Sequence, residues 1–331
     1  MALTSEVKMM EKNLLEIRNL STYYYTEDGI VRAVDNVGMG LSRGGSVGIV
    51  GESGCGKSTL GLSIMRLIRP PGRIVDGEIV FDGQDIVKMS SEGVRLLRGG
   101  KIAMVFQDPM SSLNPVFNIG SQIGEAMKLH GEIKFKPQIK DHVVEMLAKV
   151  GISDGGRRFS EYPHQFSGGM RQRVMIAMAL SCNPELLIAD EPTTSLDVTI
   201  QAQILDLMRQ LQREFNSAII LITHNVAIVA EFCEEVAVMY AGRIVEHSTA
   251  YNVFKRPKHP YAQALLGSVP RVDSTLEELV TIPGQVPSLM DPPSGCVFHP
   301  RCSHAMKICS SLVPEMLEVE SGHEVACHLY H

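Results

Sequence analysis

Four short, almost continuously apolar runs punctuate the chain, each bounded by glycine, proline or a charged residue. They read SVGIV, KIAMVFQ, ELLIAD and SAIILITH, at residues 46–50, 101–107, 185–190 and 217–224. Runs of this length predict strands that are buried on both faces, as in a parallel sheet covered by helices. Helix-like segments alternate with them, at residues 57–68, 120–129, 139–150, 169–181 and 198–215. The alternation predicts an α/β fold with a mainly parallel sheet.

Other parts of the chain show a different pattern. The first 45 residues and residues 77–86 predict antiparallel strands, and residues 236–246 predict a hairpin that turns at Ala241-Gly242. After residue 250 prolines cluster and the regular periodicity fades. We therefore expect a main domain over residues 12–250 and a separate, small, loop-rich C-terminal extension over residues 251–331.

Composition narrows the class of protein. The chain has 44% hydrophobic and 21% charged residues, which is typical of a globular protein, and its net charge of −6 argues against a nucleic-acid partner. The N-terminal residues lack a basic segment followed by an apolar one, and the apolar runs are too short to span a membrane. We expect a cytosolic chain whose thiols stay reduced.

The stretch GESGCGKST, at residues 51–59, fits the phosphate-loop pattern G-x-x-x-x-G-K-[ST], and it lies between a predicted strand and a predicted helix. Glycines allow backbone N–H groups to curl around phosphate oxygens at the helix N-terminus. Lys57 is expected to neutralise the phosphates and the Ser58 hydroxyl to bind Mg²⁺. The predicted ATP-binding residues are Gly51, Glu52, Ser53, Gly54, Cys55, Gly56, Lys57, Ser58 and Thr59.

Polar residues end three of the predicted buried strands. Asp190 and Glu191 follow one strand, where Asp190 suits Mg²⁺ binding and Glu191 suits polarising the attacking water. Gln107 and His224 end two others, within reach of Mg²⁺, the water or the γ-phosphate if the strand ends meet. Taken singly, Gln107 and His224 are equally well explained as ordinary strand-end polar residues.

A second glycine-rich helix start, FSGGMRQR at residues 166–173, completes a set of motifs. With this set the chain resembles the ATP-binding subunits of ABC transporters over nearly its whole length. The resemblance implies a P-loop ABC ATPase domain, with an antiparallel β subdomain and a helical subdomain at about residues 108–180. It also implies the catalytic base Glu191, the Q-loop Gln107, the switch histidine His224, the signature motif Ser167, Gly168, Gly169 and Met170, and the D-loop Ser195, Leu196 and Asp197. Tyr24 matches the aromatic residue that stacks on adenine, although Tyr23 and Tyr25 leave the register open.

The resemblance also implies an assembly. Each ATP would lie between the phosphate loop of one subunit and the signature motif of a partner, which is either a second copy or, as the resemblance favours, a paralogous sister ATPase. Two integral membrane permease subunits and an external solute-binding protein would complete an importer, with this chain peripheral on the cytoplasmic face of the membrane.

Stretches such as QDPMSSLNP and KHPYAQALLGSVP resemble the oligopeptide/dipeptide group of importers, which includes subunits for nickel uptake. Import of di- or oligopeptides is the expected function. Import of nickel or another solute by the same family is an alternative, and a soluble ABC ATPase is a weaker one. Two positions depart from the family pattern: Met170 replaces the usual glutamine of the signature, and Asn225 replaces the aspartate that commonly follows the switch histidine.

Four of the seven cysteines lie in the C-terminal extension, at Cys296, Cys302, Cys309 and Cys327. A cytosolic location argues against disulfides, and the intervals of five, six and seventeen residues lack the close pairs of structural zinc sites. Spread thiolates in a loop-rich segment suit a [4Fe–4S] cluster, and the importer group has a similar cysteine pattern that is associated with such a cluster. Zn²⁺ and unliganded thiols are the alternatives.

Overall fold

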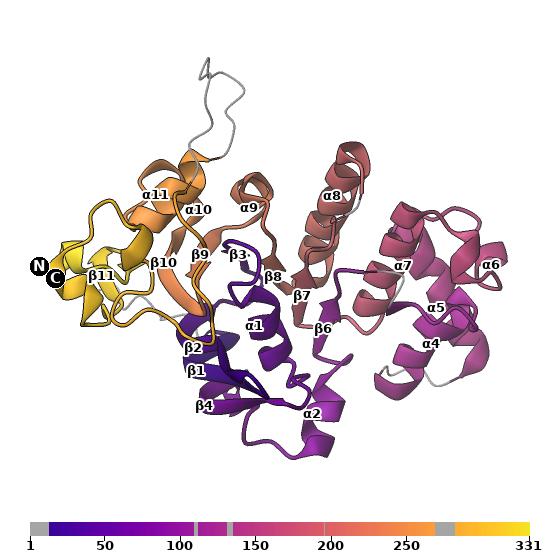
Figure 1. The fold of residues 1–331 in the computed structure, drawn as a ribbon. Coiled ribbons are helices and arrows are strands. Elements are labelled where there is room, and N and C mark those ends of the chain that lie inside the picture. The colour runs from indigo at the N-terminus through magenta and orange to yellow at the C-terminus, as the bar shows by residue number, and fades with distance from the viewer. Residues whose placement is uncertain (1–12, 109–111, 131–134, 195, 269–281) are drawn as a thin grey trace, which may run out of the picture.

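The computed structural model describes residues 13–108, 112–130, 135–194, 196–268 and 282–331 (Figure 1). Its centre is a parallel arrangement of β3 (Ser46–Val50), β8 (Ala218–Ile222), β7 (Leu186–Asp190) and β6 (Ile102–Val105), neighbours in that order. All residues of β3, β7 and β8 are buried, as their continuous apolar runs predict. The carboxyl ends of these strands share one edge of the sheet.

A second, antiparallel sheet covers one side of this centre. It has the order β2 (Gly29–Leu41), β1 (Leu15–Thr26), β4 (Gly72–Phe81) and β5 (Gln84–Asp85). Helix α1 (Lys57–Ile64) lies between the two sheets, because Leu60 and Ile64 share one apolar core with residues of β4 and β8 (Figure 1). Helix α1 is shorter than predicted, since Arg66 adopts a positive φ of 49° and ends it.

Helices fill the rest of the main domain. The chain between β6 and β7 forms a lobe of α4 (Ile119–His130), α5 (Lys136–Lys149), α6 (Gly155–Arg158) and α7 (Gly168–Leu180). This lobe lies on the side opposite the C-terminal extension (Figure 1). The remaining helices are α2 (Ser91–Leu97), α8 (Val198–Phe215) and α9 (Val226–Phe232). None of the described helices is both long enough and apolar enough to cross a bilayer.

The C-terminal extension contains α10 (Ala250–Lys255), α11 (Pro260–Gly267), β11 (Leu317–Glu320), β12 (His323–Val325) and short 3₁₀ turns. It is not the separate unit that the fading periodicity predicts. Strand β12 pairs with β10 (Arg243–Thr249), which pairs with β9 (Glu235–Tyr240), so one sheet of eight strands runs from β11 to β6. A strand of three residues is too short to show a period of two, which is why the sequence pattern misses it.

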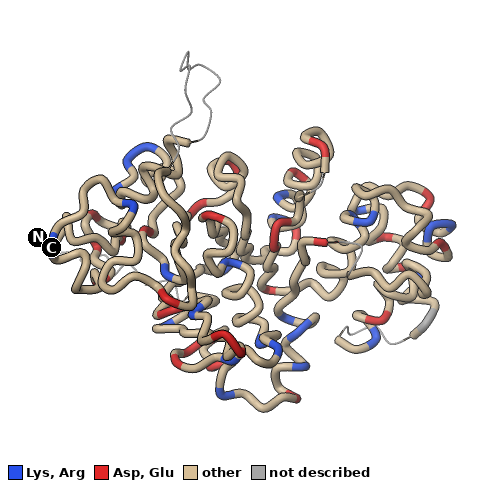
Figure 2. The backbone as a smooth tube through the Cα atoms, viewed as in Figure 1, with Lys and Arg blue, Asp and Glu red and all other residues tan. Residues whose placement is uncertain are grey.

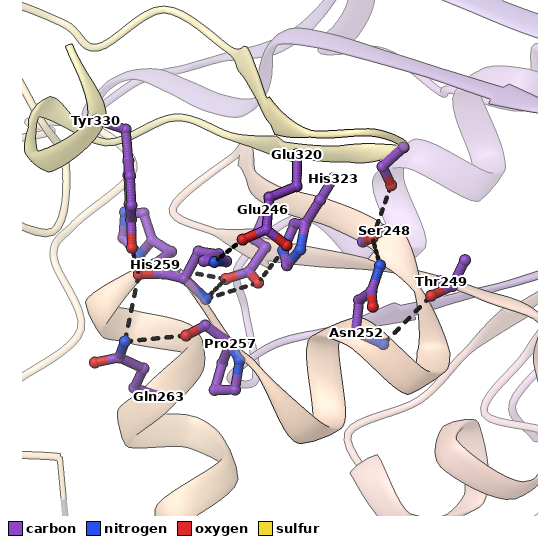
Figure 3. Close-up of polar contacts among 12 residues, drawn as sticks. Glu246, Ser248, Thr249, Asn252, Pro257, His259, Gln263, Glu320, His323 and Tyr330 are labelled. Atoms are coloured by element: carbon purple, nitrogen blue, oxygen red, sulfur yellow. Dashed lines mark hydrogen bonds and ion pairs between the residues drawn. The ribbon is translucent and has the colours of Figure 1, made fainter.

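A buried carboxylate joins β10 to the extension (Figure 3). Glu246 and His323 are both fully buried, and His323 Nε2 donates to Glu246 Oε1 at 2.8 Å. The backbone N–H groups of Lys258 and His259 also donate to this carboxylate, at 2.9 and 2.7 Å. Elsewhere, basic and acidic side chains are interspersed along the described elements (Figure 2).

Candidate functional site

The phosphate loop connects β3 to the N-terminus of α1. Gly56 has a φ of 107°, and a Cβ there would lie 1.9 Å from the carbonyl oxygen of Ala33, so only glycine fits. Lys57 is buried, and its Nζ donates to the carbonyl oxygens of Gly51 and Glu52 at 2.7 and 2.9 Å. The loop is therefore already curled, with its lysine held against it.

The other loop residues point in different directions. Ser53, Gly54 and Ser58 are exposed and Thr59 is partly exposed, whereas Cys55 is fully buried, and burial raises the pKa of its thiol. The side chain of Glu52 turns away from the loop, toward Arg301 of the extension.

Asp190 and Glu191 stand where β7 ends, beside the phosphate loop. Ser58 Oγ donates to Asp190 Oδ1 at 3.0 Å, so the predicted hydroxyl and carboxylate meet across 132 residues of sequence. Asp190 is buried, and this burial raises the pKa of its carboxyl despite the hydrogen bond from Ser58. Two oxygen donors of this kind suit Mg²⁺.

The strand ends bring Gln107 and His224 to Glu191. Gln107 Nε2 donates to Glu191 Oε2 at 2.8 Å, and His224 Nδ1 lies 3.0 Å from Glu191 Oε1. Thr194 Oγ1 also donates to Oε2, at 2.8 Å, and no sequence motif identified this residue. Burial would raise the pKa of Glu191, but the hydrogen bonds from His224 and Thr194 outweigh it and lower that pKa. Glu191 is therefore an ionised carboxylate with an oriented set of partners.

Asn225, the residue after the switch histidine, has a local role. Its side chain caps α9 by accepting the N–H of Ala227 at 3.1 Å. Within the part of the chain that the structure describes, Asn225 makes no hydrogen bond to His224, and the histidine is oriented by Glu191 itself.

The signature motif lies in the helical lobe, apart from the phosphate loop of the same chain (Figure 1). Ser167 caps α7 by accepting the N–H of Met170 at 3.3 Å, and Gly168 is the first helical residue. A Cβ on Gly169 would lie 2.8 Å from Ile200, so this glycine lets α7 approach α8. In the D-loop, Asp197 caps α8 through Ile200 N–H at 2.9 Å and Leu196 packs against the core, whereas Ser195 lies outside the described residues.

The three tyrosines of β1 have different surroundings. Tyr23 Oη donates to Asp35 at 2.7 Å, and the guanidinium of Arg73 lies 4.3 Å from the ring centre of Tyr25. The ring of Tyr24 lies against the backbone of Gly72, where a Cβ would come within 2.6 Å of it.

The four cysteines of the extension line one small pocket together with His259 and Phe298. Burial raises the pKa of Cys296, Cys302 and Cys327, the last to about 11. Among the described residues, no group of three or more histidine, cysteine, aspartate or glutamate side chains has an arrangement that could hold a metal ion. The structure thus gathers the thiols around one space but does not show an assembled metal site.

Comparison with known proteins identifies the family. Residues 34–194 match the model of the ABC transporter family, and residues 245–309 match that of the oligopeptide/dipeptide transporter C-terminal region. The chain is 48% identical to the dipeptide transport ATP-binding protein DppD of Bacillus subtilis, over 97% of this chain and 95% of that protein. It is 49% identical to the oligopeptide transport ATP-binding protein OppD of Escherichia coli, over 95% of this chain and 92% of that protein. A dimeric ATP-binding cassette solved in a post-hydrolysis state with ADP and Pi superposes with a TM-score of 0.64 at 26% identity, over 71% of this chain and 98% of that one. The chain therefore belongs to the ABC transporter ATP-binding proteins, within the oligopeptide/dipeptide transporter group.

Proposed function

We propose that this chain is the ATP-hydrolysing subunit that powers the import of di- or oligopeptides through an ABC transporter. The observation that carries the proposal is the carboxylate of Glu191, held between Gln107 and His224 at the sheet edge beside the phosphate loop. The names of the relatives supply the solute class, because both DppD and OppD are peptide transport proteins.

The residues divide the reaction between them. Glu191 takes a proton from the attacking water, and Gln107 and His224 orient that water and the γ-phosphate. Lys57 and the loop N–H groups stabilise the charge on the phosphate oxygens. Ser58 and Asp190 would hold Mg²⁺, which would supply positive charge to neutralise the phosphates. The remaining loop residues enclose the phosphates through their backbone.

The position of the signature motif supports an assembly with a partner subunit. Ser167, Gly168, Gly169 and Met170 serve the ATP of a partner subunit, with the D-loop residues 195–197 at the same interface. The separation of α7 from α1, and the dimeric form of the similar cassette, support this arrangement. We take the partner to be a paralogous sister ATPase, with two membrane permease subunits contacted through the helical subdomain (residues 108–180) and an external solute-binding protein.

Three further assignments complete the proposal. The chain acts at the cytoplasmic face of the membrane as a peripheral subunit. Its nucleotide-binding domain covers residues 12–250 and its extension residues 251–331. Tyr24 stacks on adenine, which is supported by the engagement of Tyr23 and Tyr25 with Asp35 and Arg73.

Cys296, Cys302, Cys309 and Cys327 would hold a [4Fe–4S] cluster, with Zn²⁺ as the alternative. One observation fits a bound group. His259 Nδ1 accepts the N–H of Tyr261 at 3.0 Å, so a neutral ring carries its proton on Nε2. That Nε2 is buried, has no hydrogen-bond partner among the described residues, and belongs to a side chain that lines the cysteine pocket. A thiolate or sulfide is an acceptor that would satisfy it.

Anaerobic purification tests the cluster. We expect brown protein with about four iron ions and four labile sulfides per chain, and a matched Cys302→Ala variant with much less of both. Stoichiometric zinc in a colourless sample would instead support a Zn²⁺ site. Metal-free protein would contradict both the cluster and the Zn²⁺ site.

A growth experiment tests the transport function. Cells that need an imported dipeptide as the source of an essential amino acid should stop growing when the gene for this chain is deleted. The wild-type chain and the control Glu231→Gln, at an exposed position on α9, should restore growth, whereas Glu191→Gln should not. Unchanged growth on dipeptide after deletion, or loss of nickel uptake alone, would overturn the peptide assignment.

A further inference from the structure

The C-terminal extension is in direct contact with the phosphate loop. Arg301 ends a 3₁₀ turn (His299–Arg301) that lies between Cys296 and Cys302. Its Nη1 and Nη2 donate to the two carboxylate oxygens of Glu52, at 2.7 and 3.1 Å, across 249 residues of sequence. A two-pronged pair of this kind fixes orientation as well as distance.

The surroundings of Arg301 separate this pair from an ordinary surface ion pair. The Arg301 side chain is 5% exposed and that of Glu52 is 24% exposed. Arg301 also donates to Tyr240 Oη at 3.2 Å and to the carbonyl oxygens of Pro283 and Ile282 at 2.8 and 3.4 Å, so its remaining donors are used. The hydrogen bonds to Glu52 raise the pKa of Arg301, which stays charged. Buried and fully bonded pairs are costly to break from one side.

A second residue of the extension holds the backbone of Glu52. The N–H of Glu52 donates to Tyr261 Oη at 2.9 Å. Tyr261 is fully buried, and its ring packs on those of Tyr240 and Phe298, with centroids 4.5 and 5.4 Å away. The carbonyl oxygen of Glu52 accepts Lys57 Nζ. The extension therefore holds, by side chain and by backbone, the residue that the phosphate-binding lysine contacts.

We propose that Arg301 and Tyr261 are positioning residues of the nucleotide site, and that ATP affinity depends on the folded cysteine-containing turn that carries Arg301. The proposal rests on the proposed function, in which the loop binds ATP. A glycine-rich loop loses much conformational freedom when it wraps phosphates, so contacts that order it beforehand strengthen binding. The hydrogen bonds of Arg301 and Tyr261 to the phosphate loop end on Glu52 and not on the catalytic side chains at the ends of the strands, so we expect the effect on ATP binding rather than on the chemical step.

Four variants test this by calorimetric titration with Mg²⁺-ATP, on a Glu191→Gln background that does not consume the nucleotide. Arg301→Met should weaken binding about 10- to 30-fold, and Arg301→Lys less, because one ammonium cannot reproduce the two-pronged contact. Tyr261→Phe, which keeps the ring but loses the hydroxyl, should weaken it about threefold. The matched control is Lys258→Met, which removes an ion pair to Glu320 in the same extension without a contact to the loop. Its affinity should stay within about twofold.

Two further measurements separate positioning from general damage. In the hydrolysing protein, Arg301→Met should raise the KM for ATP about as much as the dissociation constant, with kcat within about threefold. The double variant Glu52→Gln, Arg301→Met should bind ATP no more weakly than Arg301→Met alone, because the two substitutions remove the same contact. Additive effects would overturn the proposal.

Wild-type affinity in Arg301→Met would also overturn it. If that variant does not fold, Tyr261→Phe decides, and wild-type affinity there would count against the proposal. Absence of ATP binding by the Glu191→Gln protein before any other change would instead contradict the proposed function.

Discussion

Two glutamates of this chain, Glu191 and Glu246, have similar numbers of hydrogen-bonding partners but differ in burial and in the kind of partner. Glu191 accepts hydrogen bonds from Gln107 and Thr194 and lies beside His224, whose ring is 54% exposed. Glu246 accepts from His323 and from the backbone N–H groups of Lys258 and His259, in a fully buried joint between β10 and the extension. At Glu191 the threonine hydroxyl and the imidazole can each reverse from donor to acceptor, whereas at Glu246 the two backbone groups can only donate.

The difference separates a carboxylate that can change partners from one that cannot. The environment of Glu191 tolerates rearrangement when nucleotide and water arrive, which a catalytic base needs. The environment of Glu246 fixes one geometry and holds the extension to the main sheet. We expect glutamine at position 246 to affect mainly the stability of the fold, and glutamine at position 191 to affect mainly ATP hydrolysis.

The largest effect on stability is expected for Glu246→Gln. Its amide NH₂ would face backbone donors at a fully buried position, so we expect a loss of about 2 to 4 kcal/mol in the free energy of unfolding. Chemical denaturation measures this, with Glu231→Gln on exposed α9 as the control, which should change by less than about 0.5 kcal/mol. If the Glu246→Gln protein were as stable as the control, Glu246 would not be the residue that holds the extension to the main sheet.

The contact between β10 and the C-terminal extension should also weaken at alkaline pH. Burial would lower the pKa of His247, but Glu235 and Glu324 outweigh it and raise that pKa to about 9. Because the folded pKa exceeds the unfolded value of about 6.5, this stabilisation is complete below pH 6.5 and is lost as the pH rises through 9. The difference between these two pKa values corresponds to about 3 kcal/mol.

Unfolding by urea at pH 6 and pH 9.5 measures that loss. In His247→Gln the dependence on pH should be smaller by the same amount. Equal pH dependence in the two proteins would show that His247 is not the titrating group.

The smallest effect on stability is expected for His224→Ala, since the side chain is exposed, with a change within about 0.5 kcal/mol. The hydrogen bond from His224 lowers the pKa of Glu191, so its removal raises that pKa. The base is then protonated at higher pH, and the acidic limb of the residual kcat profile should move to higher pH. A limb that stays in place, or moves to lower pH, would contradict the link between the two side chains.

The nucleotide site could be predicted from the sequence to a greater extent than the extension. Gln107, Glu191 and His224 follow buried strands, and parallel strands bring their carboxyl ends to one edge, so the pattern indicated that they could meet and the family resemblance then assigned them to one site. Thr194 could not be found in this way, because its contact depends on the positive φ of Glu191, 46°, and the turn that follows. The contact of Arg301 with Glu52 could not be found either, since no periodicity links residues 249 positions apart.

The most direct test of the account measures ATP binding and phosphate release in the same sample of Glu191→Gln protein. The geometry predicts that the variant binds ATP within about threefold of the wild-type affinity while its phosphate release falls at least about 100-fold, because the glutamine cannot take the proton of the attacking water. Phosphate release at the wild-type rate would contradict the assignment of Glu191 as the catalytic base and, with it, the mechanism proposed for this chain.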